Sequence, residues 1–325
     1  MTRQRNPIFG QFLLLCTLFA VFVVSVAMIF LAATVFRSQI PFFQLLDNAP
    51  SVAVETGPKP ATLPGVTELY VPPTTKLYMV MGSDYRPQAG YRTDTIILIA
   101  VDSLSGKVSL VSFPRDLWVT IPGYYEQRIN TVMQVGGFPL MANTMQANFG
   151  IYPREYAMID MDGFLRVIDV LGGVTFETDY YTADRCERYL EPGGWCEAGP
   201  GTVSFDADWA LWYVRARYNS SDFDRMRRTQ EVMGAVMKKV MSPAGMVKMP
   251  MLMSIYESEV ESNISPDDLL PLIRVAFGLN TSEDVKSYVI GPNEVTSWTT
   301  SEGASVLLPN TAAIQALLQS ALLFE

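Results

Sequence analysis

Five arginines stand close together in the stretch YVRARYNSSDFDRMRRTQ, residues 213–230; they are Arg215, Arg217, Arg225, Arg227 and Arg228. The chain as a whole is acidic, with a formal net charge of -9, yet it carries 17 arginines and only 7 lysines. A guanidinium group stays ionised and offers a planar fork of donors that grips carboxylate or phosphate oxygens in pairs. The cluster therefore indicates an anion-binding site, although a solvated basic helix face is the simpler structural alternative.

Two aspartates stand near the ends of a second polar stretch, GSDYRPQAGYRTDT, which spans residues 82–95. Apolar runs on either side predict that Asp84 follows one strand and that Asp94 begins the next, with Arg92 between them. Two carboxylates brought together by such a loop can hold one ion, and oxygen ligands suit Mg²⁺ or a similar hard cation. Aspartates in turns more often only form the turn, so the pair alone is a weak signal.

Two shorter motifs add basic residues at the ends of predicted elements. SFPRD places Arg115 directly after an apolar strand and next to Asp116, and QRIN places Arg128 in a turn-like stretch. A plain structural ion pair explains the first motif equally well. If the site catalyses attack by a hydroxyl group, Asp94 and Asp116 are the candidate general bases because they lie in these motifs.

The sequence contains no histidine, which excludes several classes of catalytic site. Ser-His-Asp and Cys-His nucleophilic catalysis both need an imidazole, as do zinc-protease helices with the H-E-x-x-H motif. Any chemistry must therefore use carboxylates, arginines, hydroxyl groups or a hard metal ion.

The elements that would position these residues alternate between strands and helices. Three apolar runs between residues 76 and 116 predict strands of a sheet that is covered on both faces. Later stretches predict helices, including one with Asp206 or Asp208 as N-cap and a long one at 225–241. This order predicts an α/β domain. For Arg215 and Arg217 to reach one anion, the chain should leave the helix near Val214, because extended residues two apart share a face.

The first forty residues predict a membrane anchor. No charged residue lies between Arg5 and Arg37, and residues 12–35 would form a helix of about 36 Å, longer than the hydrocarbon core of roughly 30 Å. Basic residues before this run favour a cytoplasmic N-terminus. We therefore expect a cytoplasmic segment at 1–11, a single transmembrane anchor at 12–36, a proline-rich extracytoplasmic linker at 37–75 and one extracytoplasmic domain at 76–325. The protein would then lie in the cell membrane with its domain outside.

Cys186 and Cys196 flank the loop ERYLEPGGW. In an oxidising compartment a local disulfide between them is expected, with two free thiols as the alternative. A metal site is not favoured here, because too few further ligands are present.

An ordered set of motifs resembles the LytR–CpsA–Psr family of bacterial cell-wall ligases: GSDYR, YRTDT, SFPRD, RIN, DMDGF, VIDVLGGV, ALWYVRARY and SDFDRMRRTQEV. The resemblance covers residues 77–240 and implies an αβα sandwich with a central mixed sheet. It also implies an enzyme that moves a glycopolymer from a polyprenyl diphosphate carrier to a peptidoglycan hydroxyl group, forming a phosphodiester. The implied partners are the lipid-linked glycopolymer, peptidoglycan and the bilayer.

The same resemblance implies roles for individual residues. Asp84 and Asp94 would hold Mg²⁺, and Asp94, Arg115 and Arg217 would be catalytic. The diphosphate would be bound by Arg92, Arg115, Arg128, Arg215, Arg217, Arg225 and Arg228. Two departures from the family pattern stand out. Asp224 replaces a glycine in Asp-Phe-Gly-Arg, and Thr229 replaces a glutamine that is expected to touch phosphate.

Several alternatives remain open at this stage. A diphosphatase would use the same residues with water as acceptor, and a non-catalytic protein would only bind an anionic wall polymer. Nucleic-acid binding is not expected, because the chain is acidic and has no helix-turn-helix or zinc module. Met233, Met237 and Met241 could line a lipid cleft or belong to the core.

Overall fold

The computed structural model describes residues 61–86, 90–218, 220–265 and 284–324. All of them belong to one compact unit, Val52–Glu325. The expected cytoplasmic segment 1–11 and anchor 12–36 lie outside the described residues, together with much of the expected linker. Within the described ranges, no helix has both the length and the apolar character that crossing a bilayer requires.

A six-stranded mixed sheet forms the centre of this unit, in the order β11-β6-β1-β2-β3-β12. Its strands are β1 (Thr75–Arg86), β2 (Gly90–Asp102), β3 (Val108–Ser112), β6 (Glu155–Asp160), β11 (Val260–Ser262) and β12 (Val285–Val289). The first three strands pair antiparallel, whereas β6 runs parallel to β1 and β12 runs parallel to β3. The predicted α/β class with a central mixed sheet is therefore confirmed.

The helices are α3 (Val132–Phe149), α4 (Met161–Leu171), α5 (Ala207–Arg215), α6 (Asp222–Val240), α7 (Pro243–Val247), α8 (Met249–Glu259) and α10 (Thr311–Leu323), with a 3₁₀ turn η2 (Ile129–Thr131). The short strands pair as β4 (Trp118–Thr120) with β5 (Glu126–Arg128), β7 (Val174–Thr178) with β10 (Gly201–Phe205), β8 (Thr182–Arg185) with β9 (Trp195–Ala198), and β13 (Val295–Thr299) with β14 (Ser305–Pro309). The predicted helix at 225–241 corresponds to α6, which begins three residues earlier.

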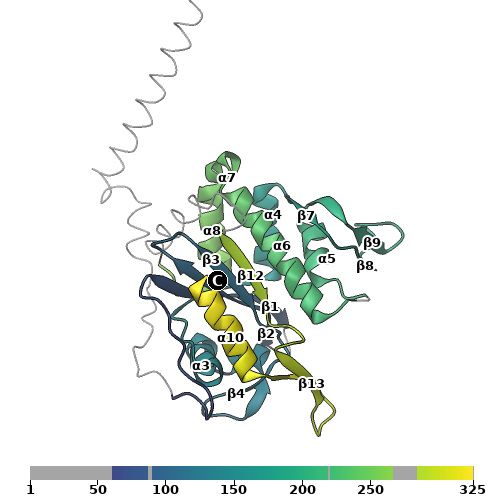
Figure 1. The fold of residues 1–325 in the computed structure, drawn as a ribbon. Coiled ribbons are helices and arrows are strands. Elements are labelled where there is room, and N and C mark those ends of the chain that lie inside the picture. The colour runs from purple at the N-terminus through teal and green to yellow at the C-terminus, as the bar shows by residue number, and fades with distance from the viewer. Residues whose placement is uncertain (1–60, 87–89, 219, 266–283, 325) are drawn as a thin grey trace, which may run out of the picture. The chain divides into compact units, whose positions relative to one another are not determined.

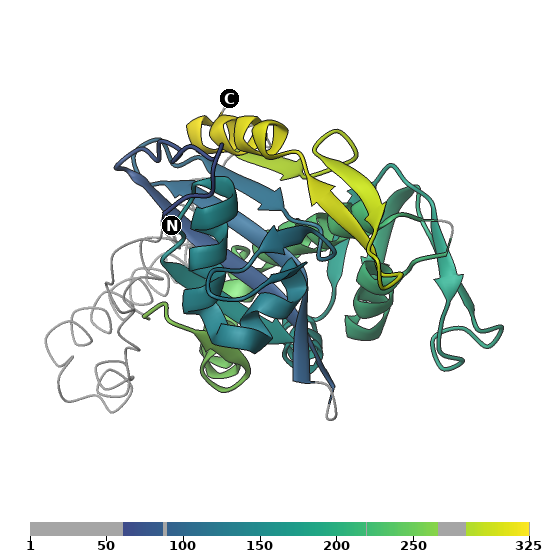
Figure 2. The ribbon, with the colours of Figure 1, turned by 90° about the horizontal axis from the view of Figure 1, so that it is seen from below.

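Helices cover both faces of the central sheet (Figures 1 and 2). Side chains alternate between the faces of a strand. Leu98 of β2 packs in a core with Met141 of α3 and Leu318 of α10. Ile97 points to the opposite face with its pairing partner Ser112, whose hydroxyl oxygen accepts a hydrogen bond from Gln230 of α6 at 2.8 Å. The sheet is thus the middle of three layers, as the αβα arrangement requires.

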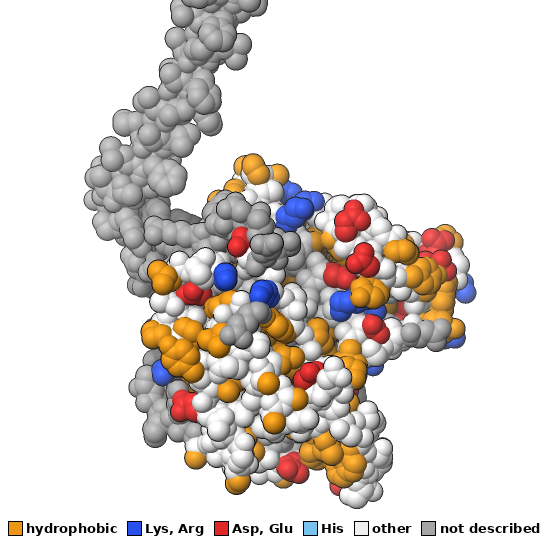
Figure 3. Space-filling model, viewed as in Figure 1, with side chains coloured by type: hydrophobic (Ala, Val, Ile, Leu, Met, Phe, Trp, Pro, Cys, Tyr) orange, Lys and Arg blue, Asp and Glu red, His pale blue; other side chains and the backbone are white. Residues whose placement is uncertain are grey.

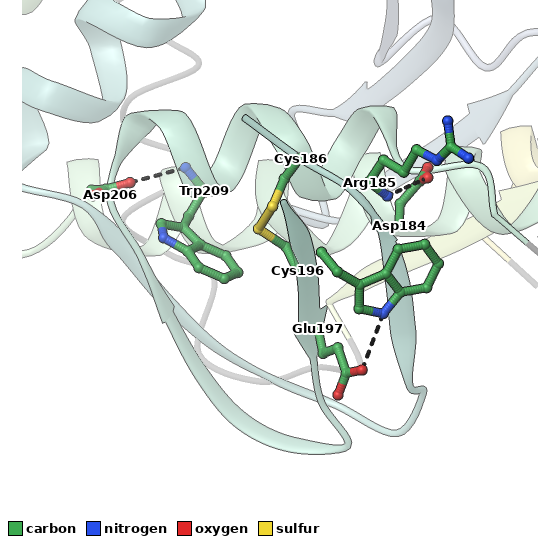
Figure 4. Close-up of a disulfide and its surroundings, with 8 residues drawn as sticks. Asp184, Arg185, Cys186, Cys196, Glu197, Asp206 and Trp209 are labelled. Atoms are coloured by element: carbon green, nitrogen blue, oxygen red, sulfur yellow. Dashed lines mark hydrogen bonds between the residues drawn. A yellow bond between two sulfur atoms is a disulfide. The ribbon is translucent and has the colours of Figure 1, made fainter. Parts of the chain in front are cut away.

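The β8–β9 hairpin, residues 182–198, carries the expected disulfide. Cys186 follows β8 directly and bonds to Cys196 in β9 (Figure 4). Cys196 pairs with Asp184 across the hairpin, and Trp195 pairs with Arg185. The covalent link closes the loop between the strands, so the relative position of their side chains is fixed.

Candidate active site

A β-bulge in β2 sets the position of Asp94. Gly82 of β1 pairs with Thr95, but the next residue, Ser83, pairs with Thr93, so that Asp94 has no pairing partner in β1. Bulges insert one extra residue, bend the strand locally and redirect a side chain. Asp94 is thereby directed to a place where the loop after β3 and the start of α6 approach the sheet.

Three elements contact Asp94. Arg115, after β3, donates to its Oδ2 atom at 2.9 Å. Asn130 of η2 donates to Oδ1 at 3.4 Å, and Arg225 of α6 donates to the backbone carbonyl at 3.1 Å. The last of these contacts joins residues that lie 131 positions apart in the chain. Asp94 and Arg115, which the sequence assigned to one site, are therefore in direct contact.

The connection between α5 and α6 supplies the other arginines. Helix α5 ends at Arg215, and Ala216 continues in an extended conformation with ψ 138°. This agrees with the predicted exit from the helix near Val214. Helix α6 then begins with a capping box, in which Ser221 accepts from the Asp224 amide and Asp224 accepts from the Ser221 amide. The cap fixes the first turn of α6, and Asp224 serves this purpose in place of the family's glycine.

One carboxylate in that first turn contacts three guanidinium groups. Asp222 Oδ1 lies 2.8 Å from Arg225 Nη2, 3.7 Å from Arg115 Nε and 3.8 Å from Arg217 Nη2. The pKa of Arg225 is lowered overall, mainly by burial and also by the positive charges of Arg115 and Arg217. The negative charge of Asp222 opposes this shift. Asp222 is thus the counter-charge that allows the arginines to stand together without a bound anion.

These residues border a polar pocket of about 450 Å³. Its lining consists of Arg92, Asp94, Arg115, Asp116, Arg128, Asn130, Arg217 and Ser305. Four arginines and two aspartates give this lining a formal charge of +2. The pocket is therefore suited to an anion with several oxygen atoms.

Ser305 reaches the pocket through the β13–β14 hairpin. Leu307 of β14 forms a bridge with Leu117, and its amide donates to the Asp116 carbonyl at 3.0 Å. Arg128 donates to the Ser305 carbonyl at 2.8 Å and lies 3.0 Å from an Asp116 carboxylate oxygen. The hairpin thus helps to hold Arg128 at the pocket.

Four predicted site residues are not among those that line the pocket. Arg225 lies next to it and contacts Asp94 and Asp222. Arg215 is exposed at the end of α5, and Asp84 is the pairing partner of Arg92 but does not itself line the cavity. Arg228 is 1% exposed and donates from Nε to the Tyr213 carbonyl at 2.9 Å and from Nη2 to the Ala216 carbonyl. Because its donors satisfy the C-terminal carbonyls of α5, the structure gives Arg228 a structural position and not a phosphate-facing one.

Buried Arg228 and exposed Arg215 should differ in how much they contribute to the stability of the fold. Arg228→Ala leaves two carbonyl groups without their donor and creates a cavity, so the free energy of unfolding should fall by about 3 kcal/mol. Arg215→Ala removes an exposed side chain and should change it by less than about 0.5 kcal/mol. Chemical denaturation of the purified full-length variants measures both values. Wild-type stability in Arg228→Ala would contradict the structural assignment.

Thr229 and Gln230 also have partners within the protein. The Thr229 hydroxyl donates to the Arg225 carbonyl at 3.0 Å. The Gln230 amide donates to Ser112 Oγ at 2.8 Å and to the Tyr288 carbonyl at 2.9 Å, so that it ties α6 to the sheet. Of the methionines at 233, 237 and 241, none is buried.

Sequence reasoning did not assign Asn130 and Ser305, which line the pocket, or Asp222, which pairs with Arg115 and Arg217 of its lining. Asp222 lies within one of the family-like motifs, three positions before Arg225, and this spacing places the two on one helix face. Spacing could therefore have indicated it. Ser305 carries no such signal, because it acts through its backbone carbonyl and lies 177 positions from Arg128.

The described residues contain no group of three or more aspartate, glutamate, cysteine or histidine side chains that could hold a metal ion. Mg²⁺ sites on phosphate substrates commonly use one or two carboxylates, with phosphate oxygens and water as the other ligands. Asp94 fits this pattern, and the buried Oδ1 atom of Asn130 beside it has no hydrogen-bond partner. The donor set therefore fits an ion shared with a phosphate substrate and not a closed protein cage.

The fold and the site together describe an α/β protein with an arginine-rich anion pocket at the end of its central sheet. The chain belongs to the LytR_cpsA_psr family, whose model matches residues 74–321. The resemblance seen in the motifs is thereby confirmed.

Known proteins agree with this assignment. Regulatory protein MsrR of Staphylococcus aureus (strain COL) is 31% identical over 215 residues, 65% of this chain and 63% of that protein. TagU of Oceanobacillus iheyensis, a polyisoprenyl-teichoic acid–peptidoglycan teichoic acid transferase, is 28% identical over 222 residues, 64% of this chain and 65% of that protein. The chain thus matches less than two thirds of the length of either relative.

The crystal structure of Bacillus subtilis TagV has the same fold. Its TM-score is 0.64 at 22% sequence identity, and the alignment covers 78% of this chain and 98% of that one. The family therefore shares the mixed α/β architecture and includes a teichoic acid transferase.

Proposed function

We propose that this protein is a membrane-anchored phosphotransferase of the cell wall. It transfers a glycopolymer from a polyprenyl diphosphate carrier to a hydroxyl group of peptidoglycan. The observation that carries the proposal is the meeting of Arg92, Arg115, Arg128 and Arg217 around one pocket that also contains Asp94. The name of the relative TagU, which joins a polyisoprenyl-linked donor to peptidoglycan, supports the same donor and acceptor classes.

The arginines would act on the diphosphate by charge and by position. Phosphoryl transfer spreads negative charge over the oxygen atoms of the group that moves, so fixed guanidinium groups stabilise the transition state. Asp94, Asp116 and Asp222 hold Arg115 in place, and Asp116 and Asp222 also pair with Arg128 and Arg217. Little reorganisation is then needed when the donor binds.

The proposed reaction balances as a displacement at phosphorus. The acceptor oxygen forms a bond to the phosphorus that bears the glycopolymer, and the bond to the polyprenyl phosphate breaks. The acceptor proton passes to a carboxylate, for which Asp94 and Asp116 are available in the pocket lining. Asp94 would hold Mg²⁺, which would neutralise charge on the diphosphate, whereas Asp84, the second carboxylate expected to hold the ion, does not line the pocket.

The location of the reaction follows from the donor. A polyprenyl carrier stays in the bilayer, so an enzyme that uses it gains from its own anchor. We assign this role to residues 12–36, whose uncharged run is long enough to cross the hydrocarbon core. The catalytic domain would then lie outside the cell membrane and the N-terminus in the cytoplasm.

Reconstitution tests the proposal. The full-length protein in detergent is incubated with a polyprenyl diphosphate-linked glycan, peptidoglycan oligomers and Mg²⁺, with EDTA in a parallel sample. We expect polymer covalently joined to peptidoglycan, release of polyprenyl phosphate, and loss of both with EDTA. Free phosphorylated glycan without attachment would instead identify a diphosphatase, and binding without any product would identify a non-catalytic binder.

A further inference from the structure

Exposed aromatic side chains gather on and around the β8–β9 hairpin, beside the pocket. Tyr218, which follows the pocket residue Arg217 directly, is 53% exposed. Its ring lies edge to face with that of Trp195 in β9, with the ring centres 4.7 Å apart. Figure 3 shows hydrophobic side chains beside charged ones over β8 and β9. Trp195 is partly buried, so the exposed ring of this pair is that of Tyr218, and an aromatic ring left in water beside a polar pocket is a candidate binding surface.

Asp184 joins this aromatic pair to the pocket. Its carboxylate in β8 accepts hydrogen bonds from the backbone amides of Arg217 and Tyr218, the latter at 3.1 Å. Asp184 also pairs with Cys196, the residue after Trp195, and Cys196 is held by the disulfide (Figure 4). The hairpin therefore fixes the backbone of Arg217 and holds the two rings at a set position next to it.

Polar groups surround the rings. The Trp195 indole nitrogen donates to Glu197 at 3.1 Å, and Arg185 pairs with Trp195 across the hairpin. An apolar ring with a carboxylate group beside it matches the chemistry of a sugar ring, which has apolar C–H faces and hydroxyl groups at its edge. A simple lipid tail would not use these charged neighbours.

We propose that Trp195 and Tyr218 form a subsite for a saccharide unit of the acceptor glycan strand. This inference rests on the proposed transferase function. The donor carries a diphosphate and can gain affinity from the arginines of the pocket. A peptidoglycan hydroxyl group brings no phosphate, so its strand must be bound by stacking and hydrogen bonds. The aromatic pair adjoins Arg217 and can deliver such a strand to the diphosphate.

Binding measurements on the full-length protein in detergent test this subsite. The probe is a peptidoglycan glycan oligosaccharide without phosphate, titrated by calorimetry. We expect Trp195→Ala and Tyr218→Ala each to raise its Kd about tenfold, and Tyr218→Phe to change it less than about threefold. Binding of a polyprenyl diphosphate should stay within about twofold of wild type in all three variants. Tyr70→Ala, a variant of another exposed tyrosine, is the matched control.

The outcomes separate this inference from the proposed function. Equal oligosaccharide binding by wild type, Trp195→Ala and Tyr218→Ala overturns the subsite, as does failure of the wild type to bind the probe. A loss of polyprenyl diphosphate binding that equals the loss of oligosaccharide binding also overturns it, because the pair would then serve the donor or the fold. If the wild type binds the oligosaccharide but transfers no glycan in reconstitution, the proposed function fails while the saccharide site stands.

Discussion

Replacing Arg115 with alanine is expected to lower the rate of glycan transfer about 1000-fold, because an arginine that stabilises a transferring phosphoryl group contributes on this scale. Arg115 lies at the centre of the site. Its Nη1 atom is 2.9 Å from Asp94 Oδ2, and its Nε atom is 3.4 Å from Asp116 Oδ2 and 3.7 Å from Asp222 Oδ1. Arg115→Lys keeps the charge but loses the planar fork, so we expect it to recover only part of the rate.

The measurement is the initial rate of attachment with saturating donor and acceptor. Arg166→Ala serves as the control, because Arg166 pairs with Glu259 at 2.8 Å on the surface, away from the pocket lining. Its rate should remain within about twofold of wild type. If Arg115→Ala transferred glycan as fast as Arg166→Ala, the pocket would not be the catalytic site.

The second large effect concerns Asp222. Asp222→Asn keeps the shape of the side chain but removes the negative charge that contacts Arg115, Arg217 and Arg225. Breaking a buried ion pair costs roughly 3–5 kcal/mol, and because Asp222 is partly exposed we expect a loss of about 2 kcal/mol in the free energy of unfolding. An added anion should then replace the missing charge.

Thermal denaturation with and without inorganic pyrophosphate separates this explanation from a general loss of packing. Pyrophosphate should raise the Tm of Asp222→Asn by more than it raises that of the wild type, because binding to the folded state alone stabilises it. Glu259→Gln, which breaks the surface pair with Arg166, should lose less than about 1 kcal/mol and show no extra response to pyrophosphate. An equal response in Asp222→Asn and wild type would contradict the role of Asp222 as internal counter-charge.

Much of this arrangement could be predicted from the sequence because local signals carried it. Apolar runs predicted the central strands, and the N-cap expected at Asp206 or Asp208 is Asp206, whose carboxylate accepts from the Trp209 amide. Helix α5 ends at Arg215, close to the predicted exit near Val214, but only Arg217 of the two arginines lines the pocket. Family-like motifs then brought Asp94 and Arg115 to one place.

What could not be predicted depends on exact backbone geometry. The bulge at Asp94 arises from a register shift against β1, and a sequence pattern with a period of two residues does not reveal it. Arg228 belongs to the same basic cluster as Arg225, yet Arg228 donates to carbonyl groups at the end of α5, whereas Arg225 contacts Asp94 and Asp222 beside the pocket. The packing of α5 against α6 and of α6 against the sheet decides which of these arginines contacts α5 and which contacts Asp94.

The central claim is that the arginine pocket binds the diphosphate of a polyprenyl-linked donor. A crystal structure of the protein with a short polyprenyl diphosphate tests it most directly. Both phosphates should lie in the pocket within hydrogen-bond distance of Arg92, Arg115 and Arg217, with the prenyl chain leading out of it. A diphosphate bound at another surface, with the ion pairs of this pocket unchanged, would contradict the account.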